Sequence, residues 1–317
     1  MNNAVVHVVA GVLRDAGGRI LLTQRPPGKH LAGLWEFPGG KCEADEAPLA
    51  ALRRELREEL GVEIRTAEKL IAVPWCYGEK SICLDVYTVR DYAGEPHGRE
   101  GQLLQWVDAH AIGDIDMPPA DRPVVSALQL PRRYAISSEP ADTPSFLQAL
   151  VRAIDSGETL VQLRSKQRAG DALRTLLPQV AALAATRGAR VLLNGNAELA
   201  AEFGLAGVHL PSVELMRCRS RPLPAQQLVA ASCHDARELA HAAAIGVDFA
   251  VLGPVAVTSS HRGQPALGWD AFAKLCVDAP FPVYALGGMQ RSDLARAIDA
   301  GAQGIAGISA FWPTALG

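Results

Sequence analysis

Three glutamates in one short charged segment are the side chains best suited to chemistry. Glu55, Glu58 and Glu59 occur in the run RRELREEL, which lies between Pro48 and a glycine. Proline suits the first turn of a helix and glycine its C-terminal end, so a helix is predicted over residues 47–60. At about 100° per residue, the three carboxylates project from one arc of this helix. Such crowded carboxylates can bind a divalent metal ion, although a charged run by itself is more often a solvated helix face.

The spacing of the residues around these glutamates favours the metal site. The stretch GGKCEADEAPLAALRRELREELGV, residues 39–62, fits the pattern G-x5-E-x7-R-E-U-x-E-E-x-G-U at every defined position, where U is aliphatic. Average residue frequencies make a chance match rarer than about one in ten million starting points. The stretch resembles the Nudix box, the signature of hydrolases that cleave a nucleoside diphosphate linked to another moiety.

The resemblance extends over almost all of residues 4–128. The stretches VVAGVLRDAGGRILLTQRPPGKHLAGLWEFPGGK, GEPHGREGQ and MPPADRPVV are similar to those of the antimutator 8-oxo-dGTP diphosphatases. The resemblance implies a Nudix α/β fold, with a mixed sheet between helices. It also implies hydrolysis of a nucleoside triphosphate to the monophosphate and pyrophosphate, with 8-oxo-dGTP as the favoured substrate. Such a reaction removes oxidised nucleotides before DNA replication and so serves DNA repair.

The same resemblance assigns residues to the metal. The carbonyl of Gly39 and the carboxylates of Glu55, Glu59 and Glu100 match the family's metal ligands, and oxygen ligands suit Mg²⁺ or Mn²⁺. Glu58 matches a further metal ligand or the general base. Glu100 could also act as the general base, so this role is left unassigned. We expect Arg54 to orient the box by pairing with a neighbouring carboxylate.

Substrate-binding residues are implied as well. Arg25 matches an arginine that holds phosphate, and Tyr77 matches an aromatic residue of the base pocket. We also expect His30 and Phe37 to contact the substrate. Asp121, in the loop MPPADRP, replaces the asparagine that reads oxidised guanine in the family. An ionised aspartate only accepts hydrogen bonds, whereas a protonated aspartate in a dry pocket can also donate one.

The pattern of the chain changes in the proline-containing segment that ends near residue 131. We therefore expect two domains, over residues 1–130 and 131–317, in line with a length of 317 residues. The first domain has 14 basic and 19 acidic residues, net −5, and the second has 17 and 15, net +2. Neither domain has the basic stripe of duplex-binding proteins, so we expect no direct nucleic-acid binding.

Eight strand-like segments alternate with helical ones from residue 133 onward. This order predicts a parallel (β/α)8 TIM barrel with its functional groups at the C-terminal ends of the strands. The stretches VQLRSK, LLNGN, GVHLPS, SCHD, GPVAVTSS, ALGGM and AGAQGIAGISAF resemble thiamin-phosphate synthase and the related thiazole tautomerase. The resemblance implies a thiazole or pyrimidine phosphate as a ligand.

Several barrel residues match the family's site, and others depart from it. The matching residues are Gln162, Arg164 and Lys166 for a pyrimidine diphosphate, Asn194 for the same substrate and its Mg²⁺, His234 for acid/base catalysis, and Thr258, Gly288 and Ser309 around the barrel mouth. Gly195 stands where the family has a metal-binding aspartate, Glu214 replaces a second aspartate, and His261 replaces a lysine. Because glycine has no side-chain ligand, we expect weak or absent synthase activity.

Six scattered cysteines, no apolar run of about 18 residues and no signal-peptide pattern indicate a cytoplasmic protein with reduced thiols and no membrane association.

Two alternatives to the nucleotide hydrolase stay open. In the first, the chain serves thiamin metabolism, with the barrel as synthase or tautomerase and the Nudix half clearing toxic or diphosphorylated pyrimidine intermediates. In the second, the barrel is a ligand-binding module that stabilises or regulates the hydrolase.

Overall fold

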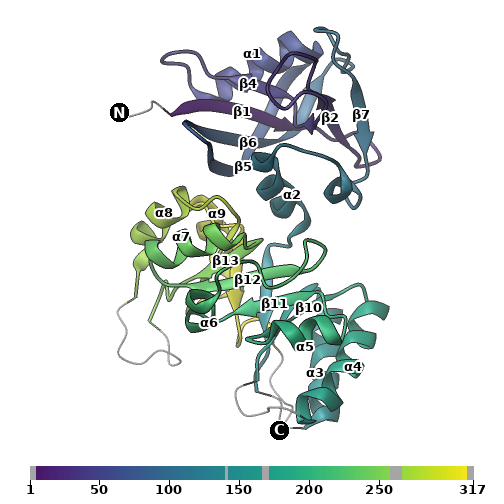
Figure 1. The fold of residues 1–317 in the computed structure, drawn as a ribbon, viewed down its shortest axis with the longest axis vertical. Helices are drawn as coiled ribbons and strands as arrows, with labels where there is room; N and C mark the ends of the chain where they lie inside the picture. Colours follow the sequence, from purple (N-terminus) through teal and green to yellow (C-terminus); the bar gives the residue numbers. More distant parts are fainter. Residues whose placement is uncertain (1–4, 140–141, 166–170, 258–265, 313–317) are drawn as a thin grey trace. The chain divides into compact units, whose positions relative to one another are not determined.

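A computed structural model of the protein describes residues 5–139, 142–165, 171–257 and 266–312. The chain divides into two compact units, Met1–Gln129 and Leu130–Gly317 (Figure 1). Each unit has its own hydrophobic core and is described separately. In the part of the chain that the model covers, no helix is long and apolar enough to cross a membrane. All six cysteines are free thiols.

The N-terminal unit contains two sheets. Their strands are β1 (Val6–Val12), β2 (Ile20–Gln24), β3 (Trp35–Glu36), β4 (Gly39–Lys41), β5 (Glu63–Tyr77), β6 (Lys80–Ala93) and β7 (Leu104–Val107). The larger sheet has the order β4-β1-β6-β5 and is mixed, because β1 pairs with β6 in parallel and with β4 in antiparallel orientation. The smaller sheet has the order β3-β2-β7 and is antiparallel.

Two helices cover opposite faces of the larger sheet. Helix α1 (Pro48–Leu60) buries a leucine stripe that includes Leu52 and Leu56 in one core cluster with Val9. Helix α2 (Arg122–Gln129) contributes Val124 to a second cluster, which contains Ala10 from the other face of β1. Two short 3-10 helices, η1 (Ile112–Asp114) and η2 (Pro119–Asp121), precede α2. The predicted mixed sheet between helices is therefore confirmed.

The C-terminal unit is a closed barrel of eight parallel strands, as predicted. Its strands are β8 (Arg133–Ile136), β9 (Leu160–Leu163), β10 (Arg190–Asn194), β11 (Gly207–Leu210), β12 (Leu228–Cys233), β13 (Phe249–Leu252), β14 (Val283–Leu286) and β15 (Gly304–Gly307). The surrounding helices are α3 (Thr143–Asp155), α4 (Asp171–Thr186), α5 (Ala197–Glu202), α6 (Ser212–Arg217), α7 (Ala236–Ile245), α8 (Gly268–Val277) and α9 (Leu294–Asp299), and the 3-10 helix η4 (Arg291–Asp293) precedes α9.

Aromatic side chains fill the inside of the barrel. The ring of Tyr134 packs edge-on against Phe249 at 5.2 Å between centroids and lies 5.9 Å from the ring of Tyr284. All three rings are fully buried, so the inside of the barrel around them is a packed core. This leaves the C-terminal ends of the strands as the open end of the barrel, where TIM barrels place their functional groups.

Candidate active site

Helix α1 brings two carboxylates against strand β4. The backbone N–H of Gly39 donates a 3.1 Å hydrogen bond to Oε2 of Glu59. The Glu55 carboxylate lies so close to Gly40 that a Cβ atom at position 40 would sit 2.3 Å from its carboxyl carbon. A larger residue at position 40 would push the Glu55 carboxylate away from β4. Glu55 and Glu59 therefore converge on the two glycines that begin the predicted motif.

Arg54 organises the acidic side chains around this point. Its Nε and NH2 atoms donate to the two oxygens of Glu46 at 3.1 and 2.9 Å, and NH1 donates to Glu55 at 2.8 Å. NH2 also donates to the carbonyl of Lys41, the last residue of β4, at 3.0 Å. A guanidinium group can make such a bidentate pair and still bind other acceptors, which a lysine cannot do. Arg54 thus holds the loop between β4 and α1 in register with Glu55.

The two remaining predicted glutamates are more exposed. The Glu58 side chain is 57% exposed and receives a 3.3 Å hydrogen bond from Arg54. Glu100 lies in the loop between β6 and β7, which is tied to the end of α1 because the Arg99 N–H donates to the Glu59 carbonyl. The Glu100 carboxylate lies 3.8 Å from Lys29 and contributes to the electrostatic potential at Glu59. Both glutamates can reach solvent while remaining beside the motif.

The environment of Glu59 fits a bound cation. Burial, together with the neighbouring carboxylates of Glu100, Glu55 and Glu36, raises the pKa of Glu59 to about 8, although the hydrogen bond from Gly39 opposes the rise. Four carboxylates in one place repel each other unless a proton or a metal ion compensates them. The donors are all oxygen atoms, which suits a hard divalent cation. Gly39, Glu55, Glu59 and Glu100 are the groups that could hold it.

A second group of the predicted residues lies around Asp121. This carboxyl group is 6% exposed at the end of η2, and it accepts a hydrogen bond from the backbone N–H of Phe37. Burial, with a smaller contribution from the nearby Glu36, raises the pKa of Asp121 to about 8, so the group is largely protonated at neutral pH. The Tyr77 hydroxyl accepts a hydrogen bond from the Ala120 N–H at 3.3 Å, which places the phenol ring beside the Asp121 loop.

Arg25 and His30 complete this side of the domain. Arg25 forms an ion pair with Glu36, and its Nε donates to the His30 carbonyl at 2.7 Å. The His30 ring packs edge-on against Tyr77 with centroids 5.6 Å apart. The predicted phosphate-binding arginine is therefore close to the predicted base pocket. In this structure its guanidinium is engaged by a carboxylate.

Glu36 was not predicted as a functional residue. It links the glutamate motif to the predicted base-binding residues, because its charge raises the pKa of both Glu59 and Asp121. Burial raises the pKa of Glu36, and the ion pair with Arg25 opposes that rise. The signal in the sequence was a single carboxylate between Trp35 and Phe37, which is an unusual place for a charge in a strand.

The open end of the barrel holds a cavity of about 670 Å³. Six of the predicted residues line it, and they come from five different strand ends: Gln162, Arg164, Asn194, His234, Gly288 and Ser309. Lys166 and Thr258, and also His261, lie outside the described residues. Glu214 does not line the cavity; its side chain is 43% exposed and pairs with Arg217 at 3.0 Å. The substituted aspartate position, Gly195, has φ +83° in the loop after β10.

Two histidines of this cavity have different surroundings. The Nδ1 atom of His234 lies 2.9 Å from Oε2 of Glu238, which also accepts the His234 backbone N–H. The ring is partly exposed to the cavity, so its other nitrogen can face a ligand. His209 is buried, with Nε2 2.8 Å from the Ser232 hydroxyl, and burial lowers the pKa of His209 to about 3. His209 is thus a neutral hydrogen-bonding group.

Comparisons with known proteins match the two halves separately. The family model described as NUDIX domain matches residues 9–127, and the model described as thiamine monophosphate synthase matches residues 133–311. The 8-oxo-dGTP diphosphatase of Haemophilus influenzae is 41% identical over 128 residues, which are 40% of this chain and 94% of the relative. The CTP pyrophosphohydrolase of Escherichia coli is 38% identical and matched over 44% of this chain and 98% of its own length. A provisionally named thiamine-phosphate synthase 2 of Aquifex aeolicus is 32% identical over 58% of this chain and 99% of the relative.

Proposed function

Because the chain belongs to the Nudix family through residues 9–127 and to the thiamine monophosphate synthase family through residues 133–311, we propose that it is a nucleotide pyrophosphohydrolase with a phosphate-binding barrel. The N-terminal half is a hydrolase of phosphoric anhydrides. Its proposed reaction adds water to a nucleoside triphosphate and releases the monophosphate and pyrophosphate. The favoured substrate is 8-oxo-dGTP, so that the enzyme removes oxidised guanine nucleotides from the pool that feeds DNA synthesis.

The observation that carries this proposal is the convergence of Glu55 and Glu59 on Gly39 and Gly40. Nudix hydrolases generally use a divalent metal, and Mg²⁺ fits the all-oxygen donor set, as Mn²⁺ also would. When bound, such an ion neutralises phosphate charge and lowers the pKa of a coordinated water. Gly39 would contribute its carbonyl, and Glu55, Glu59 and Glu100 their carboxylates.

The protein's own residues orient the reacting groups. Arg54 fixes Glu55 through its contacts with Glu46 and Lys41, so the metal-binding end is held by a rigid network. Arg25 is placed to exchange its ion pair with Glu36 for a phosphate oxygen of the substrate. Proton removal from water falls to Glu58 or Glu100, both of which are exposed and lie beside the motif.

Recognition of the base rests on Asp121. In its protonated form this carboxyl group has one O–H donor and an acceptor oxygen, which reproduces the hydrogen-bonding pattern of an asparagine side chain. The Phe37 N–H fixes its orientation, and Tyr77 and His30 offer flat apolar surfaces on which a purine can stack. Guanine and its oxidised form both present donors and acceptors, so a site with both kinds of group suits this class of base. The preference for the oxidised form follows the similarity to the 8-oxo-dGTP diphosphatase of Haemophilus influenzae.

A screen of pyrophosphate release tests this assignment. The full chain is incubated with Mg²⁺ and a panel of dGTP, 8-oxo-dGTP, dCTP and CTP. We expect the highest kcat/KM for 8-oxo-dGTP, by at least about tenfold over dGTP. A preference for CTP would change the proposed substrate from an oxidised purine nucleotide to a pyrimidine nucleotide, and the hydrolase assignment would stand. If no nucleotide released pyrophosphate, the hydrolase assignment would be rejected.

For the barrel, we propose binding of a thiazole phosphate or a pyrimidine phosphate. The supporting observation is that Gln162, Arg164, His234 and Ser309 surround one cavity of about 670 Å³, a size typical of small-molecule sites. Gly195 removes a ligand for Mg²⁺, so we expect little synthase activity. The Glu238 carboxylate orients His234 for proton transfer, which favours tautomerase chemistry over the synthase reaction.

Two experiments separate the roles of the barrel. Complementation of a thiamin auxotroph by the full chain would support a biosynthetic enzyme. A thermal shift on adding thiazole phosphate or aminopyrimidine diphosphate, without product, would instead support a ligand-binding module that regulates or stabilises the hydrolase. If the chain does not complement the auxotroph and neither compound gives a thermal shift, the proposed barrel ligand is rejected.

A further inference from the structure

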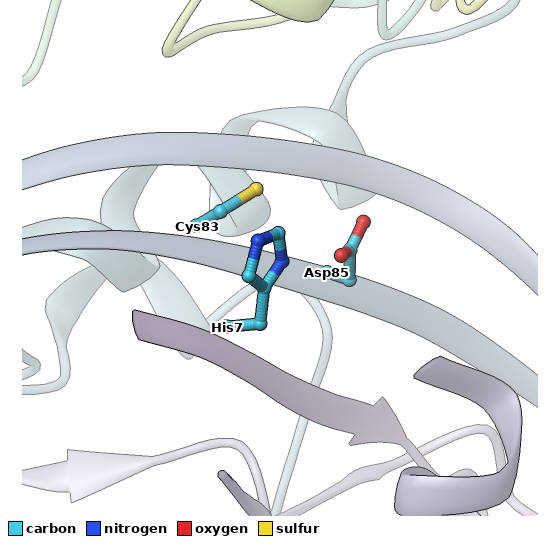
Figure 2. Close-up of side chains that lie close together, drawn as sticks. All are labelled: His7, Cys83 and Asp85. Atoms are coloured by element: carbon cyan, nitrogen blue, oxygen red, sulfur yellow. The ribbon is translucent and has the colours of Figure 1, made fainter. Parts of the chain in front are cut away.

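A group of three side chains with metal-binding atoms lies on the larger sheet of the N-terminal unit, apart from the glutamates of α1. In the parallel pair of β1 and β6, His7 lies opposite Cys83. Asp85 follows two residues later on β6, and successive side chains of a strand alternate between faces, so Cys83 and Asp85 share a face. Their ligand atoms and those of His7 all lie within 4.8 Å of one another. Figure 2 shows the His7 ring between the thiol and the carboxylate.

This cluster is separate from the proposed magnesium site. Gly40 pairs with Val9 across β4 and β1, and Val9 in turn lies opposite Asp85 on β6. Neighbouring strands are about 4.8 Å apart, so the Asp85 backbone is about 10 Å from that of Gly40. The two groups of ligands therefore do not share an ion, and none of the three residues has a role in the proposed hydrolysis.

The chemistry of the three donors differs from that of the glutamate motif. The cluster offers an imidazole nitrogen, a thiol sulfur and a carboxylate oxygen, whereas Mg²⁺ requires oxygen ligands. Nitrogen and sulfur donors favour borderline-soft divalent ions such as Zn²⁺, which takes four ligands in tetrahedral geometry. We propose that His7, Cys83 and Asp85 form a second metal site of the N-terminal domain, which binds Zn²⁺ with a water molecule as the fourth ligand.

The surroundings of Asp85 support a cation at this place. Its side chain is 8% exposed, and the ammonium group of Lys69 on β5 lies 2.6 Å from its Oδ1 atom. A buried carboxylate needs a compensating positive charge, and Lys69 supplies it when no metal is bound. The Lys69 side chain is 55% exposed, so it can turn into solvent when a divalent ion takes its place. Zinc and the ammonium group therefore compete for Asp85.

The other two donors are not engaged in this way. His7 is exposed on β1, and Cys83 is partly buried and is not part of a disulfide. Zinc binding would convert the Cys83 thiol to the thiolate with release of a proton. The ion would join β1 to β6, two strands that are already paired, so it needs no rearrangement of the backbone.

Cobalt substitution tests this proposal on the full chain. The protein is stripped of metal with a chelator, supplied with saturating Mg²⁺ to fill the glutamate site, and titrated with Co²⁺. We expect one equivalent of Co²⁺ to produce a thiolate-to-cobalt charge-transfer band, which Zn²⁺ then bleaches because it binds such sites more tightly. A glutamate site cannot produce this band, since it contains no sulfur. Absence of the band in the unaltered protein would refute the site.

Two ligand variants, one control and one variant of the competing lysine test the assignment. Cys83→Ser should abolish the band, and Cys76→Ser, which alters an exposed cysteine at the far end of β5, should leave it unchanged. His7→Ala should weaken Co²⁺ binding by at least about tenfold. Lys69→Gln should tighten it, because the competing ammonium is removed. A band that persists in Cys83→Ser, or affinities that do not change in His7→Ala and Lys69→Gln, would overturn the assignment. Because His7 and Lys69 are exposed, their variants test the site even if Cys83→Ser folds poorly.

Discussion

The backbone N–H of Gly39 and the carboxylate of Glu59 are joined by a 3.1 Å hydrogen bond. This bond links the C-terminal half of α1 to the first residue of β4. It anchors one carboxylate of the motif beside the carbonyl that would bind the same ion. A catalytic metal site requires such fixed ligands, because a displacement of about 1 Å is enough to impair catalysis.

Replacement of either converging glutamate by its neutral isostere should remove metal binding. We expect Glu55→Gln and Glu59→Gln each to lower kcat by at least about 10²-fold, since a catalytic metal supplies several kcal/mol of transition-state stabilisation. The fold should persist, because glutamine fills the same volume and relieves carboxylate repulsion. Steady-state kinetics with Mg²⁺ measures the effect. Glu68→Gln is the control, because Glu68 forms an exposed ion pair with Arg90. Near-normal turnover of both motif variants would contradict the metal assignment.

Arg54 and Glu46 should act as one positioning unit. We expect Arg54→Lys and Glu46→Gln each to lower kcat by about tenfold, because a lysine cannot make the bidentate contact and a glutamine lacks the charge. The double variant should be little worse than either single variant, because both remove the same interaction. A double-mutant cycle on kcat and on Mg²⁺ affinity measures this coupling. Fully additive losses would show that the two residues act separately.

Base recognition should depend on pH through Asp121. With the pKa of Asp121 raised to about 8, the proton that donates to the base is lost above that pH. We therefore expect kcat/KM for 8-oxo-dGTP to fall as the pH rises through about 8, and this fall should be absent in Asp121→Asn. An identical alkaline limb in the two proteins would assign the titration to another group.

The same residue should affect stability with a definite sign. The unfolded carboxyl group titrates near pH 4, so between about pH 4 and 8 the folded protein binds more protons at this position than the unfolded one. Its contribution to stability is thus complete at low pH and is lost as the pH rises through this window. Asp121→Asn should flatten this part of the profile, which chemical denaturation at pH 5 and pH 9 would measure.

Restoring the family aspartate in the barrel should not restore synthase activity. Gly195 has φ +83°, a conformation that side chains other than asparagine and aspartate rarely adopt. We expect Gly195→Asp to cost about 1 kcal/mol of stability and to give no Mg²⁺-dependent thiamin phosphate formation, because Glu214 lies away from the cavity. Gly188→Asp, another glycine with positive φ and an open surrounding, is the control for strain alone. Strong synthase activity in Gly195→Asp would contradict this expectation.

Local patterns were sufficient to predict several elements. The proline and the glycine around the charged run predicted a helix over residues 47–60, and α1 spans Pro48–Leu60. The alternation of strands and helices predicted the closed eight-stranded barrel. These features depend on neighbours in the chain, which a sequence displays directly.

Contacts between distant residues were beyond such patterns. The ion pair of Arg25 with Glu36 and the hydrogen bond from Phe37 to Asp121 depend on how loops and strands meet in space. The grouping of His7 with Cys83 depends on the parallel register of β1 and β6, two strands separated by most of the domain's sequence. A shift of one residue in that register would place the two side chains on opposite faces, and nothing in either strand alone specifies it.

The short strand β4 has a consequence for how this domain can diversify. A side chain at Gly39 would collide with the backbone of Val9, and one at Gly40 would displace the Glu55 carboxylate, so substitutions at either glycine would disturb the proposed metal site. The groups that we propose to face the nucleobase come instead from η2, from the end of β5 and from the loop after β2. Substrate choice can therefore drift in natural populations, or be altered by directed evolution, while the hydrolytic chemistry is inherited unchanged.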